Sequence, residues 1–466
     1  MGSDLAGSGY GAKRSDSVIP EKYGKSLRDG VKLELRDDLE KSRREFSPGR
    51  VQRFPGALVE TTGPAASLAT SGPVAPLAVV EEREDYKNSQ LSVVARGEGY
   101  DVEFRRGRES SVGTVESRPL RGYITEETVR GLEDVYVGQI LKTMRSAPSE
   151  PEAQARFLSR FYDILMSFGR ILSNALGDDI LEGISVLPKG SRLLLRLDEK
   201  ALGIPWELAN QSGGTGILGI NYSIGKIVVS DKRALQNTRG PRRNTRVLLI
   251  DAASEEAAWG AQALRGFLPI LASLERSLHF AGVTVDKVIG RDATKENIVR
   301  KLQGDNDIVI FNTHGSFDDR NMQTSLWINQ WGEKLSSQDI FELYRGSRYP
   351  PPLLWVSYAC ETATQSSWDK PEGESSLATA FNVLGVPFIG PYWSAWGSRV
   401  ESHMGSTDLL LKTFFSKLFS KPPWTIGDAL MEGKREAIKL EENARFPDWA
   451  NFTLYGSPGL TITVAK

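Results

Sequence analysis

The chain has one thiol and three imidazoles with which to carry out nucleophilic chemistry. Among its 466 residues Cys360 is the sole cysteine, and the histidines are His279, His314 and His403. A cysteine thiolate attacks carbonyl carbons, and a neighbouring imidazole takes up the thiol proton and returns it to the leaving amine. A single thiol excludes an internal disulfide and a zinc site built on several thiolates. We therefore expect any thiol chemistry to depend on Cys360.

Two apolar runs put His314 and Cys360 at comparable positions in the expected fold. Residues 308–311 (IVIF) lead to His314, and residues 353–356 (LLWV) lead to Cys360. Short runs of this kind are typical of buried strands in a parallel sheet, whose carboxyl ends meet at one ligand-binding crevice. The two residues are 46 positions apart (360 − 314), near the roughly 50 positions that separate the pair in caspase-like peptidases. The sequence therefore predicts a His314–Cys360 dyad.

The residues beside the dyad suggest how it would act. Gly315 lacks a Cβ, so its backbone N–H can approach a substrate oxygen, and the N–H of Cys360 is the second expected oxyanion donor. Glu361, Asp318 and Tyr358 are candidates for substrate binding, although the two acids are equally typical of solvated loops. An isolated cysteine is also commonly a buried apolar residue, and an isolated histidine a hydrogen-bonded surface residue. Taken together, the pattern favours the catalytic interpretation.

Composition describes an ordinary globular chain, with 40% hydrophobic and 25% charged residues and a net charge of −1. This balance gives no electrostatic signature for nucleic acid or anionic membrane. Apolar runs stay shorter than the roughly 18 residues of a membrane-spanning helix, and the N-terminus lacks the apolar core of a signal peptide. We expect a cytoplasmic protein without a metal or other cofactor. A nucleotide-binding domain is an alternative, but no glycine-rich phosphate loop follows a predicted strand.

The chain divides into three predicted segments. Residues 1–85 are rich in charge, glycine, serine and proline, which is typical of a disordered or linker-like extension. Residues 86–235 combine a hairpin and further short strands with helices, and predict a smaller α+β accessory half. Residues 236–466 alternate strands and helices, so we expect an α/β half with a mostly parallel sheet flanked by helices on both faces.

Apolar periodicity and punctuation by glycine and proline predict individual elements as well. Helices are expected over 124–144 and 268–282, and a strand is expected over 217–229. Loops that follow the strands of the second half are expected to border a cleft. These loops are 316–335, 361–373 and 393–400.

Five stretches resemble the CHAT peptidases, a caspase-like family of the same clan as caspases, gingipains and separases. The resemblance extends over residues 90–466. It implies a caspase-like fold in which 86–235 is an inactive, pseudo-caspase-like accessory half and 236–466 is the catalytic half. It also implies that His314 and Cys360 are the dyad, with Gly315 beside the oxyanion. The stretches are LDEKALGIPWEL (197–208), THGSF (313–317), SYACETA (357–363), VPFIGPYW (386–393) and WANFTLYGSPGL (449–460).

The same resemblance implies an activity and partners. CHAT peptidases occur in bacterial defence systems, where relatives cut gasdermin-like or CRISPR-linked proteins. By this resemblance the protein is expected to be a cysteine endopeptidase that cleaves a protein partner and is activated by an upstream sensor protein. The alternative is a CHAT-like scaffold or interaction module whose site is unused.

Overall fold

The computed structural model describes the chain from residue 88 onward, with gaps. All described residues belong to one compact unit, Pro76–Lys466. The extension expected at 1–85, His279, His403 and all but residue 275 of the helix expected at 268–282 lie outside the described residues. The described ranges are 88–107, 118–145, 151–210, 216–229, 245–253, 275, 283–318, 323–329, 332–345, 350–364, 376–393, 406–441 and 448–462.

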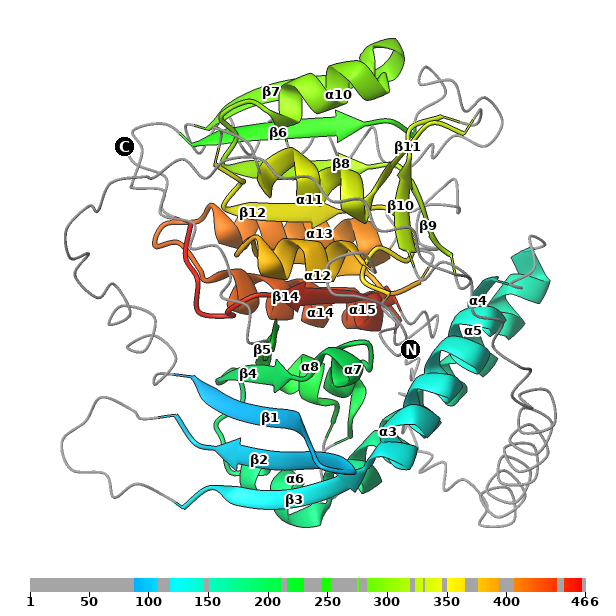
Figure 1. Ribbon diagram of the computed structural model, residues 1–466, viewed down its shortest axis with the longest axis vertical. Coiled ribbons are helices and arrows are strands. Elements are labelled where there is room, and N and C mark those ends of the chain that lie inside the picture. Colours follow the sequence, from blue (N-terminus) through cyan, green and yellow to red (C-terminus); the bar gives the residue numbers. More distant parts are fainter. Residues whose placement is uncertain are drawn as a thin grey trace, which may run out of the picture. The chain divides into compact units, whose positions relative to one another are not determined.

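The described strands form one mixed sheet of 11 strands and a separate sheet of 3 strands. Along the large sheet the order is β3-β2-β1-β4-β5-β14-β13-β12-β8-β6-β7, which runs from the bottom to the top of Figure 1. The small sheet has the order β11-β10-β9. The strands are β1 (Ser89–Arg96), β2 (Gly99–Arg105), β3 (Leu120–Thr125), β4 (Arg192–Leu197), β5 (Ser223–Val228), β6 (Arg246–Asp251), β7 (Thr284–Ile289), β8 (Ile308–Asn312), β9 (His314–Asp318), β10 (Gln323–Trp327), β11 (Lys334–Ser336), β12 (Leu354–Ser357), β13 (Phe388–Pro391) and β14 (Phe452–Tyr455).

Helices and single helical turns connect these strands. The longest described helix, α5 (Pro151–Leu176), is followed by Gly177, whose φ of 86° suits a residue without a Cβ. The α-helices are α3 (Glu126–Glu133), α4 (Lys142–Arg145), α5 (Pro151–Leu176), α6 (Asp178–Ser185), α7 (Glu199–Leu202), α8 (Leu218–Asn221), α10 (Lys295–Leu302), α11 (Ser337–Arg345), α12 (Leu377–Val383), α13 (Ser406–Leu418), α14 (Ile426–Glu441) and α15 (Asp448–Asn451). A π-helix, η1 (Asp134–Leu141), and the 3₁₀ turns η2 (Trp206–Leu208) and η6 (Gly290–Asp292) complete the set.

The first half of the large sheet begins with the predicted hairpin. Strands β1 and β2 pair antiparallel with Val93 opposite Val102, and Gly97 in the turn has a φ of 62°. On its other side β1 pairs parallel with β4, which in turn pairs parallel with β5. Burial alternates along β1 as the period of two requires, because one face of the strand packs on the core.

Two expected elements of this half differ in the structure. The helix predicted over 124–144 starts only at Glu126, because Thr125 ends β3 and its Oγ1 accepts a hydrogen bond from the N–H of Thr128 at 3.1 Å. The strand predicted over 217–229 opens with the single turn α8 before β5 begins. That turn lets Gly219 lie against Glu207, where a Cβ would come within 3.2 Å of the Glu207 carbonyl oxygen.

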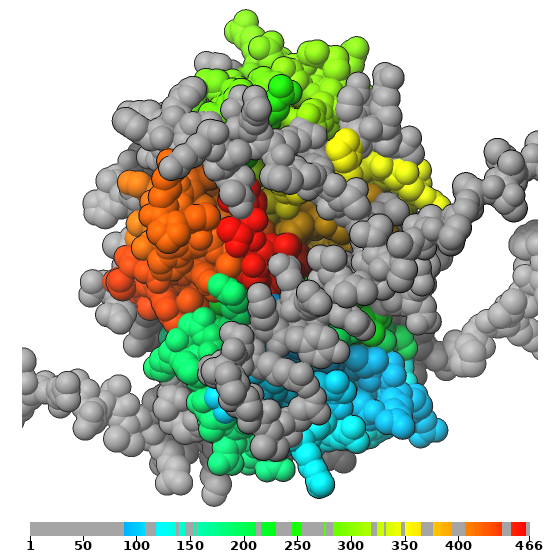
Figure 2. All heavy atoms as spheres, turned by 90° about the vertical axis from the view of Figure 1, so that its left-hand side faces the viewer, coloured from blue at the N-terminus to red at the C-terminus, as the bar shows by residue number. Residues whose placement is uncertain are grey.

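The second half of the sheet is parallel except for its last strand. Strands β7, β6, β8, β12 and β13 pair parallel, and β14 pairs antiparallel with β13. A single pair, Tyr455 with Lys226, joins β14 to β5 and makes the sheet continuous across both halves. Figure 2 shows the C-terminal segment in red between the orange helices and the green and blue residues of the first half.

Helices cover both faces of this second half, as predicted. The ring of Trp355 on β12 packs on Phe381 of α12, with ring centroids 4.7 Å apart. Three residues later Tyr358 extends from the other face, and its hydroxyl donates to Asp408 of α13 at 2.8 Å. The α/β class and the mostly parallel sheet expected from the sequence are thereby confirmed (Figure 1).

The small sheet was not predicted, since 316–335 was expected to be a loop. Strand β9 starts at His314 and pairs antiparallel with β10, so that Gly315 lies opposite Leu326. The indole N–H of Trp327 donates to Ser316 Oγ at 2.7 Å, and Leu326 and Leu335 are buried. These short strands fold because their few apolar side chains reach the core beside β8. They carry too few residues for their alternation to stand out in the sequence.

Candidate active site

The register of β8 and β12 brings the predicted dyad to one edge of the sheet. The two strands are parallel neighbours, with Phe311 opposite Ser357. The N–H of Tyr358 donates to the Phe311 carbonyl at 2.8 Å, which continues the pairing by one residue. His314 follows Phe311 by three residues, and Cys360 follows Ser357 by three. Both residues are therefore delivered to the carboxyl edge by neighbouring strands, as the sequence predicts.

A contact at Gly315 brings the two segments against each other. A Cβ built on Gly315 would lie 2.1 Å from the carbonyl oxygen of Cys360 and 3.0 Å from its backbone nitrogen. The residue beside His314 thus touches the backbone of Cys360, and only a glycine allows that approach. His314 and Cys360 are both partly exposed, whereas Ala359 and Glu361 are buried. The site therefore has accessible reactive side chains on a buried backbone.

The chain turns sharply immediately after Cys360. Glu361 has a φ of 58°, a left-handed conformation that non-glycine residues rarely adopt. Its carboxylate accepts a hydrogen bond from the backbone N–H of Phe317 on β9 at 3.0 Å, and Thr362 Oγ1 donates to the Ala359 carbonyl at 2.9 Å. Conformations of this kind occur where surrounding contacts hold them, often at functional sites. Glu361 thus ties the strand that carries His314 to the segment that carries Cys360.

The residues predicted to bind substrate occupy different environments. Glu361 is 6% exposed and bonded to β9 as described. Tyr358 is 3% exposed and its hydroxyl donates to Asp408, so it lies between the sheet and α13. Asp318 is the last residue of β9, opposite Gln323 in the small sheet. Asp318 thus lies at the opposite end of β9 from His314.

The buried acid Asp251 lies at the same edge of the sheet and was not predicted as a site residue from the sequence. Asp251 ends β6 opposite Asn312 of β8, and it accepts hydrogen bonds from Asn312 Nδ2 at 2.9 Å and from the Ala253 N–H at 3.2 Å. Burial raises the pKa of Asp251 above its ordinary value, and the two hydrogen bonds oppose that rise. The pair braces β8 two residues before His314. The sequence signal for Asp251 was its position as an acidic residue at the end of the apolar run 246–251.

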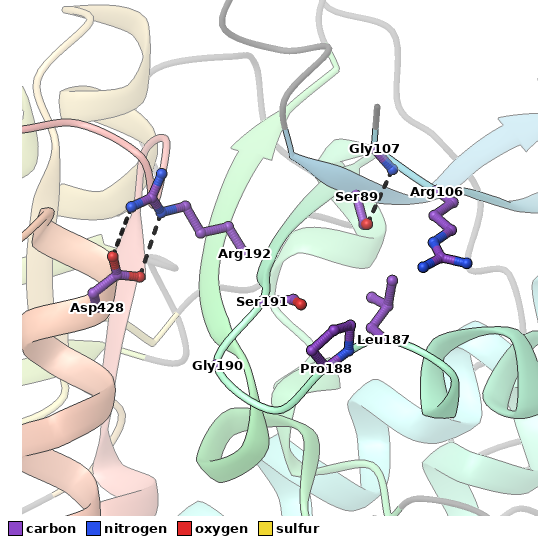
Figure 3. Close-up of a pocket in the computed structure, with 9 residues that line it drawn as sticks. All are labelled: Ser89, Arg106, Gly107, Leu187, Pro188, Gly190, Ser191, Arg192 and Asp428. Atoms are coloured by element: carbon purple, nitrogen blue, oxygen red, sulfur yellow. Dashed lines mark hydrogen bonds and ion pairs between the residues drawn. The ribbon is translucent and has the colours of Figure 1, made fainter. Parts of the chain in front are cut away.

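A surface cavity lies elsewhere in the fold. It opens where the starts of β1 and β4 meet the first turn of α14, beside Ser89, Ser191, Arg192 and Asp428 (Figure 3). None of the predicted site residues lines it. Within the described ranges, no three His, Cys, Asp or Glu side chains are grouped so that they could hold a metal ion. Among the same residues, every helix is too short or too polar to cross a bilayer.

The fold and the site together define an α/β protein in which the segments that carry a thiol and an imidazole adjoin at the carboxyl edge of a mostly parallel sheet. The CHAT domain model matches residues 156–457, which is more than half of the chain. The protein belongs to the CHAT domain family. The resemblance given by the five sequence stretches is thereby confirmed at the level of the family.

Comparison with solved structures finds distant similarities. The Arg-specific cysteine proteinase gingipain R (RGPB) matches with a TM-score of 0.41 and 14% identity over 71% of this chain and 76% of that chain. The complex of the Porphyromonas gingivalis RgpB pro- and mature domains matches with a TM-score of 0.38 and 13% identity over 73% and 79%. In the Saccharomyces cerevisiae separase–securin complex the TM-score is 0.35 with 12% identity, over 72% of this chain and 20% of that chain. No curated protein matches the sequence.

Proposed function

We propose that the protein is a cysteine endopeptidase in which Cys360 is the nucleophile and His314 the general base and acid. The observation that carries this proposal is the contact of Gly315 with the backbone of Cys360. It makes the residue next to His314 a neighbour of the only thiol in the chain. Membership of the CHAT family supports the same chemistry.

The proposed reaction proceeds by acyl transfer. The Cys360 thiol gives its proton to His314, and the sulfur attacks the carbonyl carbon of the scissile peptide bond. As the tetrahedral intermediate collapses, the carbon–nitrogen bond breaks and His314 returns the proton to the leaving amine. Water then attacks the thioester, which releases the acid product and restores the thiol. The N–H groups of Gly315 and Cys360 are the proposed donors to the oxyanion.

The proposed substrate is a protein partner, and the site is switched on by an upstream sensor protein. The resemblance to CHAT peptidases of bacterial defence systems favours a gasdermin-like or CRISPR-linked substrate. Asp318, at the end of β9, is our candidate for contact with the substrate near the dyad. Asn in place of Asp318 is then expected to raise KM for cleavage more than it lowers kcat.

The sole cysteine makes a direct test of the dyad possible. Any thioether that iodoacetamide forms with a cysteine of the native chain must be on Cys360, so the pH profile of alkylation at this residue reports the pKa of that thiol. Beside an imidazolium, a thiol pKa falls from about 8.5 to roughly 3.5–7.5. We expect the native protein to show such a lowered pKa, and His314→Ala to return it towards about 8.5. His279→Ala and His403→Ala serve as matched controls that leave the profile unchanged.

Cleavage itself is tested with a peptide library read by mass spectrometry. Native protein is expected to produce discrete cuts, and Cys360→Ala is expected to abolish them while the protein stays folded. Cuts that persist in Cys360→Ala would refute the assignment of the nucleophile. An alkylation profile that does not depend on His314 would instead favour the alternative of a CHAT-like scaffold with an unused site.

A further inference from the structure

A buried cluster of charged and phenolic side chains joins the two halves of the chain. It consists of Lys226 on β5, Glu207 on η2, Tyr392 directly after β13, and Tyr455 on β14. Lys226 Nζ lies 2.7 Å from Glu207 Oε2, and the two side chains are 0% and 2% exposed. The Tyr392 hydroxyl donates to Glu207 Oε1 at 2.6 Å and also contacts Lys226 Nζ. The ammonium group lies 4.9 Å from the centre of the Tyr392 ring and 5.6 Å from that of Tyr455.

The two tyrosines of this buried cluster also hold the segment that follows Cys360. The Tyr455 hydroxyl donates to the Ala363 carbonyl at 3.0 Å, and Thr364 Oγ1 donates to the Tyr392 carbonyl at 2.5 Å. Between these contacts, the N–H of Ala363 donates to the Pro391 carbonyl at 2.9 Å. Ala363 is thus held by the Tyr455 side chain, whose ring faces Lys226. Thr364 is held by the backbone of Tyr392, whose side chain contacts Lys226 and Glu207.

Helical elements of the first half also pack against Tyr392 and its neighbour Trp393. The ring of Tyr136, on the π-helix η1, meets Tyr392 edge-on with centroids 5.8 Å apart. Phe161 on α5 meets the neighbouring Trp393 in the same way at 5.6 Å. The segment after β13 is therefore in contact with the first half through the Tyr392 hydroxyl, which meets Glu207 and Lys226, and through two aromatic pairs.

The energetics of the ion pair indicate a role beyond holding the fold together. Burying two charges costs desolvation free energy that their attraction offsets only when the geometry is good, and apolar pairs of similar volume are often equally stable. Burial alone would raise the pKa of Glu207, but the charges of Lys226 and Lys434 lower it below its ordinary value, so the carboxylate stays ionised. Hydrogen bonds to Glu207 and Lys226 are directional, so they fix the position of the Tyr392 hydroxyl. A pair of apolar side chains would not fix it.

We infer that Lys226 and Glu207 are positioning residues for Cys360: from the accessory half they fix Tyr392 and Tyr455, which hold the backbone immediately after the nucleophile. This inference rests on the proposed function, since it states how the first half sets the reactivity of that site. It also gives the accessory half a task in catalysis that needs no catalytic group of its own. The consequence is that substitutions in β5 or η2 change the reactivity of the Cys360 thiol although they do not contact it.

The test uses the full chain and the alkylation of Cys360 by iodoacetamide across pH. Tyr455→Phe removes only the hydroxyl that holds Ala363, and the double variant Lys226→Met/Glu207→Leu removes the ion pair. Loss of alignment with His314 is expected to raise the apparent thiol pKa by about one unit, equivalent to about tenfold at fixed pH. Lys226→Met/Glu207→Gln keeps an acceptor for Tyr392 and is expected to give a smaller shift.

An ion pair between the two halves, away from the buried cluster, provides the control. Arg192 Nη2 on β4 lies 2.8 Å from Asp428 Oδ2 on α14, and both side chains are partly exposed beside the surface cavity (Figure 3). The double variant Arg192→Met/Asp428→Leu is expected to leave the alkylation profile unchanged. Thermal unfolding of every variant shows whether it is folded at the assay temperature. If the Lys226/Glu207 variant is not folded, Tyr455→Phe decides the question, because a single hydroxyl is a small loss.

Each outcome bears on the inference. A raised thiol pKa in Tyr455→Phe or in the folded Lys226/Glu207 variant, absent from the Arg192/Asp428 control, supports it. Native profiles in the folded variants overturn it, and so does an equal shift in the control, which would indicate general loosening. Failure of the proposed function is distinguishable, because then His314→Ala itself leaves the profile unchanged.

Discussion

At the scale of single residues, the absence of a side chain at Gly315 is as important as the presence of the reactive groups. A Cβ there would overlap the Cys360 carbonyl oxygen at 2.1 Å, so the β9 backbone or the Cys360 backbone would have to move. We expect Gly315→Ala to reduce kcat by about 10²–10³-fold, the loss typical of a misplaced oxyanion donor, and to destabilise the fold by about 1–3 kcal/mol through overpacking. Peptide cleavage and thermal unfolding measure the two effects.

Gly131 on α3 is the matched control for that substitution. A Cβ at Gly131 meets nothing within 4 Å, and alanine in a helix is favoured over glycine by about 0.5–1 kcal/mol. Gly131→Ala is therefore expected to keep full activity and a slightly higher melting temperature. Native turnover in Gly315→Ala would contradict the view that this close approach shapes the oxyanion site.

At the scale of elements, Glu361 couples β9 to the turn after Cys360. Its carboxylate accepts from the buried N–H of Phe317. Glu361→Ala removes an acceptor from that N–H and is expected to lower the free energy of unfolding by about 1–3 kcal/mol. It is also expected to slow peptide cleavage, because β9 carries His314. Denaturant unfolding and initial rates measure both quantities.

Glu361→Gln separates the hydrogen bond from the charge. The amide oxygen can still accept from Phe317, so this variant is expected to keep most of the stability and activity that Glu361→Ala loses. If both variants behaved alike, the negative charge rather than the bond to β9 would be the property that matters, and the proposed coupling would be wrong.

The elements also explain which parts of this site were open to prediction. The runs at 308–311 and 353–356 are long and apolar enough to predict buried strands. The ends of these strands, near His314 and Cys360, could therefore be predicted. The small sheet could not, because β9 to β11 alternate over too few residues, and their pairing depends on contacts such as Trp327 with Ser316. The left-handed turn at Glu361 was equally invisible, since nothing local requires it.

The joining of the two halves likewise depends on contacts that sequence periodicity does not reveal. Lys226 interrupts an apolar stretch that was expected to be one strand, and its partner Glu207 lies 19 residues earlier (226 − 207) in a turn. Glu207 lies in the stretch 197–208 that carries the family resemblance, whereas Lys226 lies in none of the five stretches. A buried charge shows its partner only in three dimensions. Local patterns thus predicted strands but not the buried ion pair between β5 and η2.

At the scale of the whole molecule, one continuous sheet and the buried cluster make the two halves a single unit, and their stability should depend on a third buried charge. Lys434 on α14 is 6% exposed. Burial lowers its pKa from 10.5 to about 8, and Lys226 acts in the same direction while Glu207 opposes them. Between pH 8 and pH 10.5 the unfolded chain therefore holds a proton that the folded chain has released, so this group makes stability rise with pH in that window.

Replacing Lys434 with methionine removes this contribution. Below pH 8 the folded native chain bears the full desolvation cost of a buried ammonium, so Lys434→Met is expected to gain most in melting temperature over the native protein there. This gain is expected to shrink as pH rises towards 10.5. Differential scanning calorimetry from pH 6 to pH 10 measures the difference. Lys412→Met, on the exposed side of α13, is the control and should show a flat difference. A flat difference for Lys434→Met as well would mean that α14 does not bury this charge against the accessory half, and that the two halves meet less closely than the buried cluster requires.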